Sequence, residues 1–190
     1  MKNMIKNLSA TILVVFITLS FTSLEKKQIK TNTSKVVWKG YKVTGSHHGT
    51  ISIKSGSLTF TNEKLTSGEF TIDMTTISNA DLTGKYKDKL EKHLKSDDFF
   101  EVSNFPTATL TFDKVNETKK NTYHITGDLT IKDITNPIEF NIVIDGNKAT
   151  TSLKIDRTKF NVKYRSTSFF ENLKDKAIYD EFDLEANLEF

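Results

Sequence analysis

Hydrophobic and polar residues alternate along most of this chain with a period of two. In FDLEANLEF, residues 182–190, every second position is apolar and the positions between are Asp, Glu or Asn. Residues 123–131 and 138–144 alternate in the same way, with little interruption. Such alternation is typical of β-strands that bury one face. The pattern predicts eight to ten strands, joined by short polar turns such as residues 62–64 and 145–147.

Strands with one buried face favour antiparallel pairing in a sandwich or a closed barrel. Only two prolines and eight glycines occur among the 190 residues, so few positions interrupt the strands. Closure of the sheet would also remove exposed edges. The sequence therefore predicts an all-β fold, and its length suits a single domain after a processed N-terminal segment.

One stretch, residues 85–95, breaks the alternation. In KYKDKLEKHLK the apolar residues Tyr86, Leu90 and Leu94 recur at every fourth position, with charged residues at most of the others. This spacing places them on one face of a helix. We expect a short amphipathic helix inserted between strands.

Three aromatic residues, Phe99, Phe100 and Phe105, follow this helix in a connection without strand character. Aromatic side chains in such a connection need an apolar surface to cover. They predict either a plug that closes one end of the barrel core or a lid over an internal apolar cavity.

The N-terminal residues 1–23 have the pattern of an export signal. Lys2 and Lys6 precede an apolar run from Leu8 to Leu19, which is short for a bilayer span. We expect a periplasmic or secreted protein, with retention of the segment as an anchor as the alternative. The chain has no cysteine, which excludes a lipoprotein anchor and means that the fold forms without disulfides.

The charge balance gives no support to a nucleic-acid partner. The chain has 27 Lys and Arg against 24 Asp and Glu, and only two lysines and no acid lie in residues 1–23. The remaining chain is therefore nearly neutral, whereas nucleic-acid binding favours a strongly basic domain or stripe.

The segment GSHHGT, Gly45–Thr50, holds two of the four histidines and is the first candidate for a metal site or a catalytic base. Neighbouring residues on a strand point to opposite faces, so His47 and His48 could share an ion only within a loop. No histidine pair has the spacing of known zinc sites, and no nucleophile elbow, P-loop or dinucleotide motif occurs. We expect no metal and no catalysis, and interpret the segment as a tight connection between two strands.

Asp156 and Arg157 lie between two predicted strands, residues 151–156 and 160–164. A structural ion pair or a hydrogen bond that closes the turn is the favoured interpretation. Contact between the guanidinium group and a polar ligand head group is the alternative.

Several phrases in order carry a resemblance to a known family. They include VVWKGYKVTGSHHGTISIKSGSLTF, KLEKHLKSDDFFEVSNFPTATLTF, YHITGDLTIKDITNPIEF and IDRTKFNVKYRS, and they cover residues 34–190. On these phrases the chain resembles the YceI-like family of exported bacterial proteins, in particular the members from Bacteroidetes. It departs from the classical branch of the family at Asn161, because that branch commonly has Gly after the Phe of its Asp-Arg-x-x-Phe phrase.

The resemblance implies an extended eight-stranded antiparallel β-barrel of lipocalin-like shape, with a long hydrophobic pocket. It implies binding of a polyisoprenoid or another long amphiphilic lipid, isoprenoid quinones included, and no catalytic centre or further cofactor. The connection HLKSDDFF would lie near the pocket mouth. The residues expected to line the pocket or its mouth are Trp38, Phe60, Phe70, Leu90, Leu94, Phe99, Phe100, Phe112, Ile125, Phe140, Arg157 and Phe160.

Two other classes of protein fit parts of the pattern. Outer-membrane barrels have the same alternating strands, and the C-terminal Phe190 also fits this class. In such a barrel the apolar side chains of each strand would face lipid. A His47- or His48-dependent enzyme or metal-binding protein is the other class. We favour the lipid carrier and expect no stable membrane insertion, while the identity of the lipid and the oligomeric state are left open by the sequence.

Overall fold

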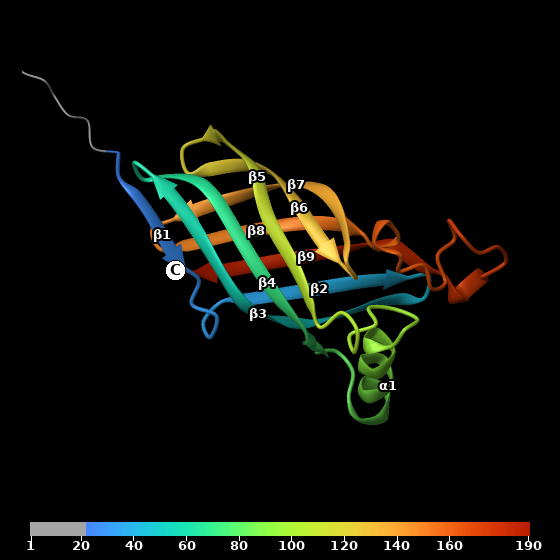
Figure 1. Cartoon of the computed structure of the whole chain (residues 1–190). Coiled ribbons are helices and arrows are strands. Elements are labelled where there is room, and N and C mark those ends of the chain that lie inside the picture. The colour runs from blue at the N-terminus through green and yellow to red at the C-terminus, as the bar shows by residue number, and fades with distance from the viewer. Residues whose placement is uncertain (1–21) are drawn as a thin grey trace, which may run out of the picture.

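A computed structural model describes residues 22–190, so the segment expected to be an export signal lies almost entirely outside the described residues. Within the described part, the strands are β1 (Leu24–Gln28), β2 (Lys35–Lys42), β3 (Gly45–Thr61), β4 (Lys64–Asn79), β5 (Thr107–Lys119), β6 (Thr122–Ile131), β7 (Ile134–Asp145), β8 (Lys148–Asp156) and β9 (Ile178–Glu189). They form one antiparallel sheet in the order β1-β3-β2-β9-β8-β7-β6-β5-β4. A further pairing of β3 with β4 closes the sheet into a barrel (Figure 1).

Strands β2 to β9 make the closed barrel, and β1 lies beside one end of β3. The first part of β3 pairs with β2, whereas residues 57–61 of β3 pair with β1. Strand β1 lies upstream of residue 34, the expected start of the domain. The predicted all-β fold and the eight-stranded antiparallel barrel are confirmed.

The alternation in the sequence decides which side chains face the barrel interior. On β6, Tyr123, Ile125, Leu129 and Ile131 are all buried, while Asp128 between them is exposed. The same parity holds on β7 and β9. Within residues 22–190 the buried apolar side chains form two clusters, one toward each end of the barrel.

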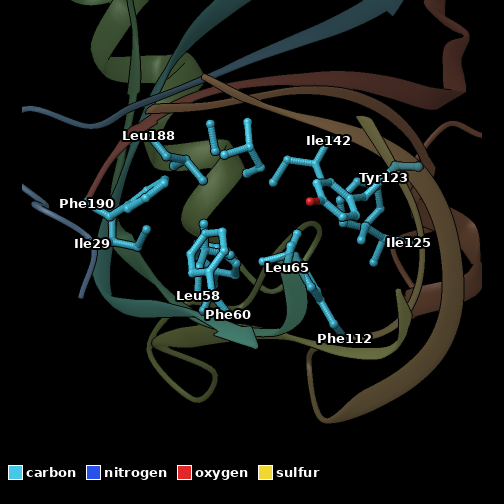
Figure 2. Packing of buried hydrophobic residues seen from close by; sticks show 14 of the residues in the cluster. Ile29, Leu58, Phe60, Leu65, Phe112, Tyr123, Ile125, Ile142, Leu188 and Phe190 are labelled. Carbon is cyan, nitrogen blue, oxygen red and sulfur yellow. The ribbon is translucent and has the colours of Figure 1, made fainter. Parts of the chain in front are cut away.

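The first cluster closes one end of the barrel, where β1 and the end of β9 meet. The rings of Phe60 and Phe190 pack with their centroids 5.5 Å apart, and the ammonium group of Lys27 lies 5.2 Å and 5.5 Å from the two centroids. Ile125 is 0 % exposed in the same cluster. Figure 2 shows Phe60, Phe190 and Ile125, with other apolar side chains of this cluster, pointing inward from the surrounding strands.

The opposite end carries most of the structure that is not strand. Helix α1 (Gly84–Lys95) confirms the predicted helix and lies across this end of the barrel (Figure 1). The 3-10 helices η1 (Arg157–Phe160) and η2 (Lys174–Lys176) belong to the long connection between β8 and β9. The predicted strand at residues 160–164 is therefore wrong, because the chain turns at Asn161 instead of extending.

The barrel core lies wholly within the described part of the chain. Its buried apolar residues run from Ile29 to Phe190, and every paired strand lies between Leu24 and Glu189. The strands of residues 24–189 thus close the barrel among themselves. Within residues 22–190, no helix is both long and apolar enough to cross a bilayer.

Candidate functional site

An apolar cavity of about 190 Å³ lies inside the barrel, between the two clusters. All eight barrel strands contribute side chains to its wall, and almost no polar atom faces it. It extends from Leu188 and Ile142, near the closed end, to Leu94 and Phe99 at the end covered by α1. The cavity is therefore long and runs along the barrel.

The space is unfilled although the residues around it are suited to a packed core. Leu153, Leu184 and Ala186 point inward and pack against the first cluster, but they are only partly buried because they also line the cavity. Protein interiors are normally close-packed, with few voids larger than a water molecule. A fold that retains such a void is suited to hold something in it.

The cavity reaches the surface where the pairing of β2 with β9 is interrupted. Gly40 pairs with Phe182 and Lys42 with Ile178, so three residues of β9 face one residue of β2. Side chains on both sides of this bulge line the cavity, and that of Tyr179 is 55 % exposed. We call this opening the cavity mouth.

Helix α1 and the connection after it cover the cavity beside the mouth. Leu94, Phe99 and Phe100 are buried and form part of the cavity wall. The rings of Phe99 and Phe100 pack edge to face, with centroids 5.1 Å apart. Of the two interpretations given above, this arrangement fits a lid better than a plug, because a cavity lies beneath the aromatic residues.

His93 belongs to the same cover but faces away from the cavity wall. Its ring packs against Tyr164 and Phe99, with centroids 4.5 Å and 5.6 Å away. Burial lowers the pKa of His93, and the nearby Arg165 acts in the same direction, while Asp98 opposes them. The neutral imidazole therefore serves as a packing group between the lid and the connection after η1.

Arg157 is buried at the mouth and holds the chain around it. Its guanidinium group donates to the carbonyl oxygens of Val162, Ile178 and Tyr179 at 2.6, 2.9 and 3.0 Å. Asp180 lies 3.5 Å away as the ionic partner. The pKa of Arg157 is lowered by burial, which the carboxylates of Asp180 and Asp156 counteract.

The neighbouring Asp156 makes different contacts, at the start of η1. Its carboxylate accepts hydrogen bonds from the backbone N–H and the hydroxyl of Thr158 and so begins η1. The favoured structural interpretation of the two residues agrees with these contacts, but the ionic partner of Arg157 is Asp180. Asn161, where the classical branch of the family commonly has Gly, ends η1 in the left-handed region with φ 58°. Asn is the residue after Gly that adopts this conformation most readily, so the departure preserves the turn.

The segment Gly45–Thr50 is the first part of β3, so its interpretation as a tight connection is wrong. The turn lies just before it, at Val43 and Thr44, and Gly45 begins the strand with φ 142°. Gly49 is required by packing, because a Cβ atom there would lie 1.8 Å from the carbonyl oxygen of Ser78.

The two histidines of this segment meet Asp81 beyond the end of β4. The Nδ1 atom of His47 lies 2.7 Å from one carboxylate oxygen, and the backbone N–H of His48 donates to the other at 2.9 Å. Burial would raise the pKa of Asp81, but hydrogen bonds from His47, His48 and Asn79 outweigh it and lower the pKa to about 2. Among residues 22–190, no three His, Asp or Glu side chains converge as a metal site.

The same network ties helix α1 to the barrel wall. The carboxylate of Glu91 on α1 accepts from the hydroxyl of Ser78 and the backbone N–H of Asn79, both at 2.8 Å. The indole N–H of Trp38, a cavity residue, donates to the carbonyl oxygen of Ser78 at 3.2 Å. His47 and His48 thus lie in a structural network that positions the lid.

The structure places eight of the twelve expected pocket residues in the cavity wall. These are Trp38, Phe70, Leu94, Phe99, Phe100, Phe112, Phe140 and Arg157. Phe60 and Ile125 instead lie in the closed end, and Leu90 and Phe160 pack in the second cluster outside the cavity wall. Ligand contact at any of the twelve stays a prediction.

Sequence reasoning missed many aliphatic residues of the wall and the polar residues of the mouth. Most of the aliphatic residues occupy the alternate positions that face the barrel interior, as the expected aromatic residues do, so the alternation in the sequence could have identified them. No sequence signal marked the bulge at the mouth. The missed wall residues include Ile51, Ile53, Ile72, Met74, Ile77, Ala108, Leu110, Leu129, Ile131, Leu153, Ile155, Leu184 and Ala186, and those of the mouth include Tyr41, Tyr179 and Glu181.

A comparison with protein-family models matches residues 28–190 to the YceI-like domain. The chain belongs to the YceI-like family. The match takes in every strand of the YceI-like barrel except most of β1. That the chain is a Bacteroidetes-type member stays a prediction.

Curated relatives of this YceI-like chain are UPF0312 proteins from Pseudomonas. Those from Pseudomonas putida strains W619 and GB-1 are each 30 % identical over 99 residues, which is 52 % of this chain and 50 % of the relative. The chain therefore spans about half the length of the curated relatives it matches.

Solved structures with similar folds include BcnA of Burkholderia cenocepacia, with a TM-score of 0.66 and 20 % identity over 84 % of this chain and 98 % of that one. A polyisoprenoid-binding domain from Saccharophagus degradans, implicated in plant cell wall breakdown, has a TM-score of 0.58 and 13 % identity. The aligned part is 87 % of this chain and 97 % of that domain. At these identities the comparisons establish the shared barrel fold.

Proposed function

We propose that this protein binds a long-chain amphiphilic lipid, a polyisoprenoid or an isoprenoid quinone, inside the barrel and does not transform it. The observation that carries the proposal is the long apolar cavity left open within an otherwise packed core. A YceI-like structural neighbour that binds polyisoprenoids supports the same class of ligand. We further propose that the protein acts in the periplasm or outside the cell.

The cavity wall explains why a lipid tail suits it. Covering apolar surface contributes ~25 cal/mol per Å2, so a few hundred Å2 of buried tail gives on the order of 10 kcal/mol before the costs of ordering. The wall offers almost no hydrogen-bonding groups, so a polar ligand would lose its hydration without compensation. The polar end of the lipid would remain at the mouth, near Tyr41, Tyr179 and Glu181.

The orientation of the strands argues against an outer-membrane barrel. The apolar side chains at alternate positions of the strands face the cavity. Charged side chains lie at exposed positions outside, among them Lys26, Lys39, Lys54 and Glu69. Membrane barrels have the reverse arrangement, with an apolar band outside and a polar interior. A water-facing carrier accounts for the apolar interior and the charged exterior together.

The direct test is organic extraction and native mass spectrometry of the protein purified from its own cell envelope. We expect a prenyl lipid or quinone at near-stoichiometric amounts, bound to the folded protein and absent after denaturation. A protein of unrelated fold, purified in parallel, controls for carry-over of membrane lipid. Recovery of no lipid above that control, together with no uptake of added polyprenol or quinone, would contradict the proposal.

Changing both His47 and His48 to Ala tests the alternative in which these residues act chemically. We expect lipid uptake to be unchanged and the free energy of unfolding to fall by about 1–3 kcal/mol, because Asp81 loses a hydrogen-bond partner. Urea unfolding and uptake of a fluorescent prenyl lipid measure the two quantities. Loss of uptake with the stability intact would show a functional role for the histidines.

The pH dependence of stability is a second test of the same hydrogen-bond network. The pKa of Asp81 is about 2 in the folded chain and 3.8 ordinarily, so its stabilising contribution is present above pH 3.8 and lost as the pH falls toward 2. In the double variant, we expect a lower free energy of unfolding at neutral pH. We also expect this free energy to decrease less as the pH falls from 3.8 toward 2.

A further inference from the structure

Exposed apolar side chains gather beside the cavity mouth. In the described part of the chain, seven large apolar side chains are at least 43 % exposed, and four of them are Val43, Phe169, Phe170 and Tyr179. The two phenylalanines are adjacent, and each is 49 % exposed. We call these four residues the mouth patch.

Hydrogen bonds hold the mouth patch to the barrel end. The hydroxyl of Ser168, beside the two phenylalanines, donates to the carboxylate of Asp180 at 2.6 Å. The backbone N–H of Val43 donates to the carbonyl oxygen of Ala177, which links the end of β2 to the connection before β9. In Figure 1 this connection extends beyond the ends of the barrel strands. Tyr179 belongs both to the patch and to the cavity wall, so patch and cavity mouth are continuous.

Basic side chains lie beside the exposed rings of the patch. The ammonium group of Lys163 lies 4.7 Å from the ring centroid of Phe169. Basic side chains beside exposed aromatic residues are typical of segments that bind at a membrane interface, where the charged end can reach lipid phosphates. Residues 163–181 hold four basic residues, Lys163, Arg165, Lys174 and Lys176, and four acids, of which Asp180 is paired with the buried Arg157.

We propose that the mouth patch docks on the surface of an anionic lipid bilayer and presents the cavity mouth to it. The phenylalanine side chains would enter the boundary between head groups and acyl chains, and the surrounding cations would bind the anionic head groups. The inference rests on the proposed function, because docking at this position lets an apolar ligand pass between bilayer and cavity without crossing water. The basic side chains beside the exposed rings, with Lys163 over the ring of Phe169, favour an anionic membrane over a second copy of this nearly neutral chain as the occupant.

Vesicle co-sedimentation tests the docking surface. Residues 22–190 are used, because the apolar run at residues 8–19 would bind bilayers by itself. The vesicles contain phosphatidylcholine alone or an equimolar mixture with phosphatidylglycerol. We expect the unchanged protein to bind the mixed vesicles. The double variant F169S/F170S should bind them at least about tenfold more weakly. Binding by the unchanged protein should also weaken as the salt concentration rises.

The matched control, L24S/V143S, removes two exposed apolar side chains at the closed end of the barrel and should bind as the unchanged protein does. Thermal unfolding checks that both variants remain folded, since surface changes of this kind alter stability little. No binding by the unchanged protein, or equal binding by F169S/F170S, would overturn the proposal. A dimer that F169S/F170S abolishes in sedimentation velocity would also overturn it, by assigning the patch to self-association.

A second measurement distinguishes failure of docking from failure of the proposed function. Both variants and the unchanged protein are loaded with a fluorescent polyprenol from detergent micelles, without any bilayer. We expect equal loading in micelles but slower transfer from mixed vesicles to F169S/F170S. Vesicle binding without loading under either condition would contradict the carrier function and leave docking standing. Loading with equal transfer rates for all three proteins would contradict docking alone.

Discussion

Replacing Arg157 with Met is expected to lower the free energy of unfolding by about 3–5 kcal/mol, measured by urea denaturation at pH 7. The side chain is 2 % exposed, and its loss would leave the carbonyl oxygens of Val162, Ile178 and Tyr179 without their donor. Asp180 would remain as a carboxylate without its cationic partner. Both effects penalise the folded state, because buried polar groups lose water without a replacement.

Two further variants separate charge from geometry. Arg157→Lys keeps the charge but cannot donate to three carbonyl oxygens in a planar fork, so we expect an intermediate loss. Lys154→Ala removes an exposed partner of Asp183 and should cost less than about 1 kcal/mol. A stability of Arg157→Met within about 1 kcal/mol of the unchanged protein would show that the carbonyl oxygens at the mouth find other donors.

The alternation in the sequence was sufficient to predict an antiparallel all-β fold and its interior face, whereas the choice of an eight-stranded barrel over a sandwich came from the family resemblance. On β6 and β9 the inward residues are those that the period of two selects. Helix α1 was equally visible, because its apolar residues change from a period of two to a spacing of four. Both predictions rest on local periodicity, which each segment shows without reference to the rest of the chain.

The height of a residue along the barrel could not be predicted in the same way. Phe60 and Phe70 both point inward, yet Phe60 packs in the closed end and Phe70 lines the cavity. Parity decides the face of the sheet, whereas height depends on strand tilt and on the register between neighbours. Aromatic residues were therefore assigned to the pocket at both levels, and aliphatic residues such as Leu184 were missed.

Contacts between distant segments explain the remaining differences. His47 and His48 gain their structural role from Asp81, and Arg157 gains its ionic partner from Asp180, at sequence separations that no local pattern reports. The mouth depends on the interrupted pairing of β2 with β9, to which neither strand's alternation gives a signal. Asn161 could have been recognised, since Asn in place of Gly is compatible with a left-handed turn, but the sequence pattern placed it within a predicted strand.

Filling the cavity should separate ligand binding from folding. Ala108 is buried on β5 and lines the cavity wall. In Ala108→Phe the added ring would occupy space that a lipid tail needs, and we expect uptake of a prenyl lipid to fall at least about tenfold. Burial of the ring gains about 1.5–3 kcal/mol, and strain in the wall offsets a similar amount. The stability of the unliganded variant should therefore stay within about 2 kcal/mol of the unchanged protein.

The matched variant Ile125→Ala should show the opposite pair of effects. Ile125 is 0 % exposed in the closed end and does not line the cavity. Its truncation should lower the free energy of unfolding by about 2–5 kcal/mol, whereas lipid affinity per folded molecule should be unchanged. Urea unfolding and fluorescence titration with a prenyl lipid measure both quantities for both variants. Ala108→Phe fills part of the cavity, whereas Ile125→Ala leaves it unchanged. Full uptake by Ala108→Phe, or loss of affinity in folded Ile125→Ala, would therefore place the ligand outside the cavity.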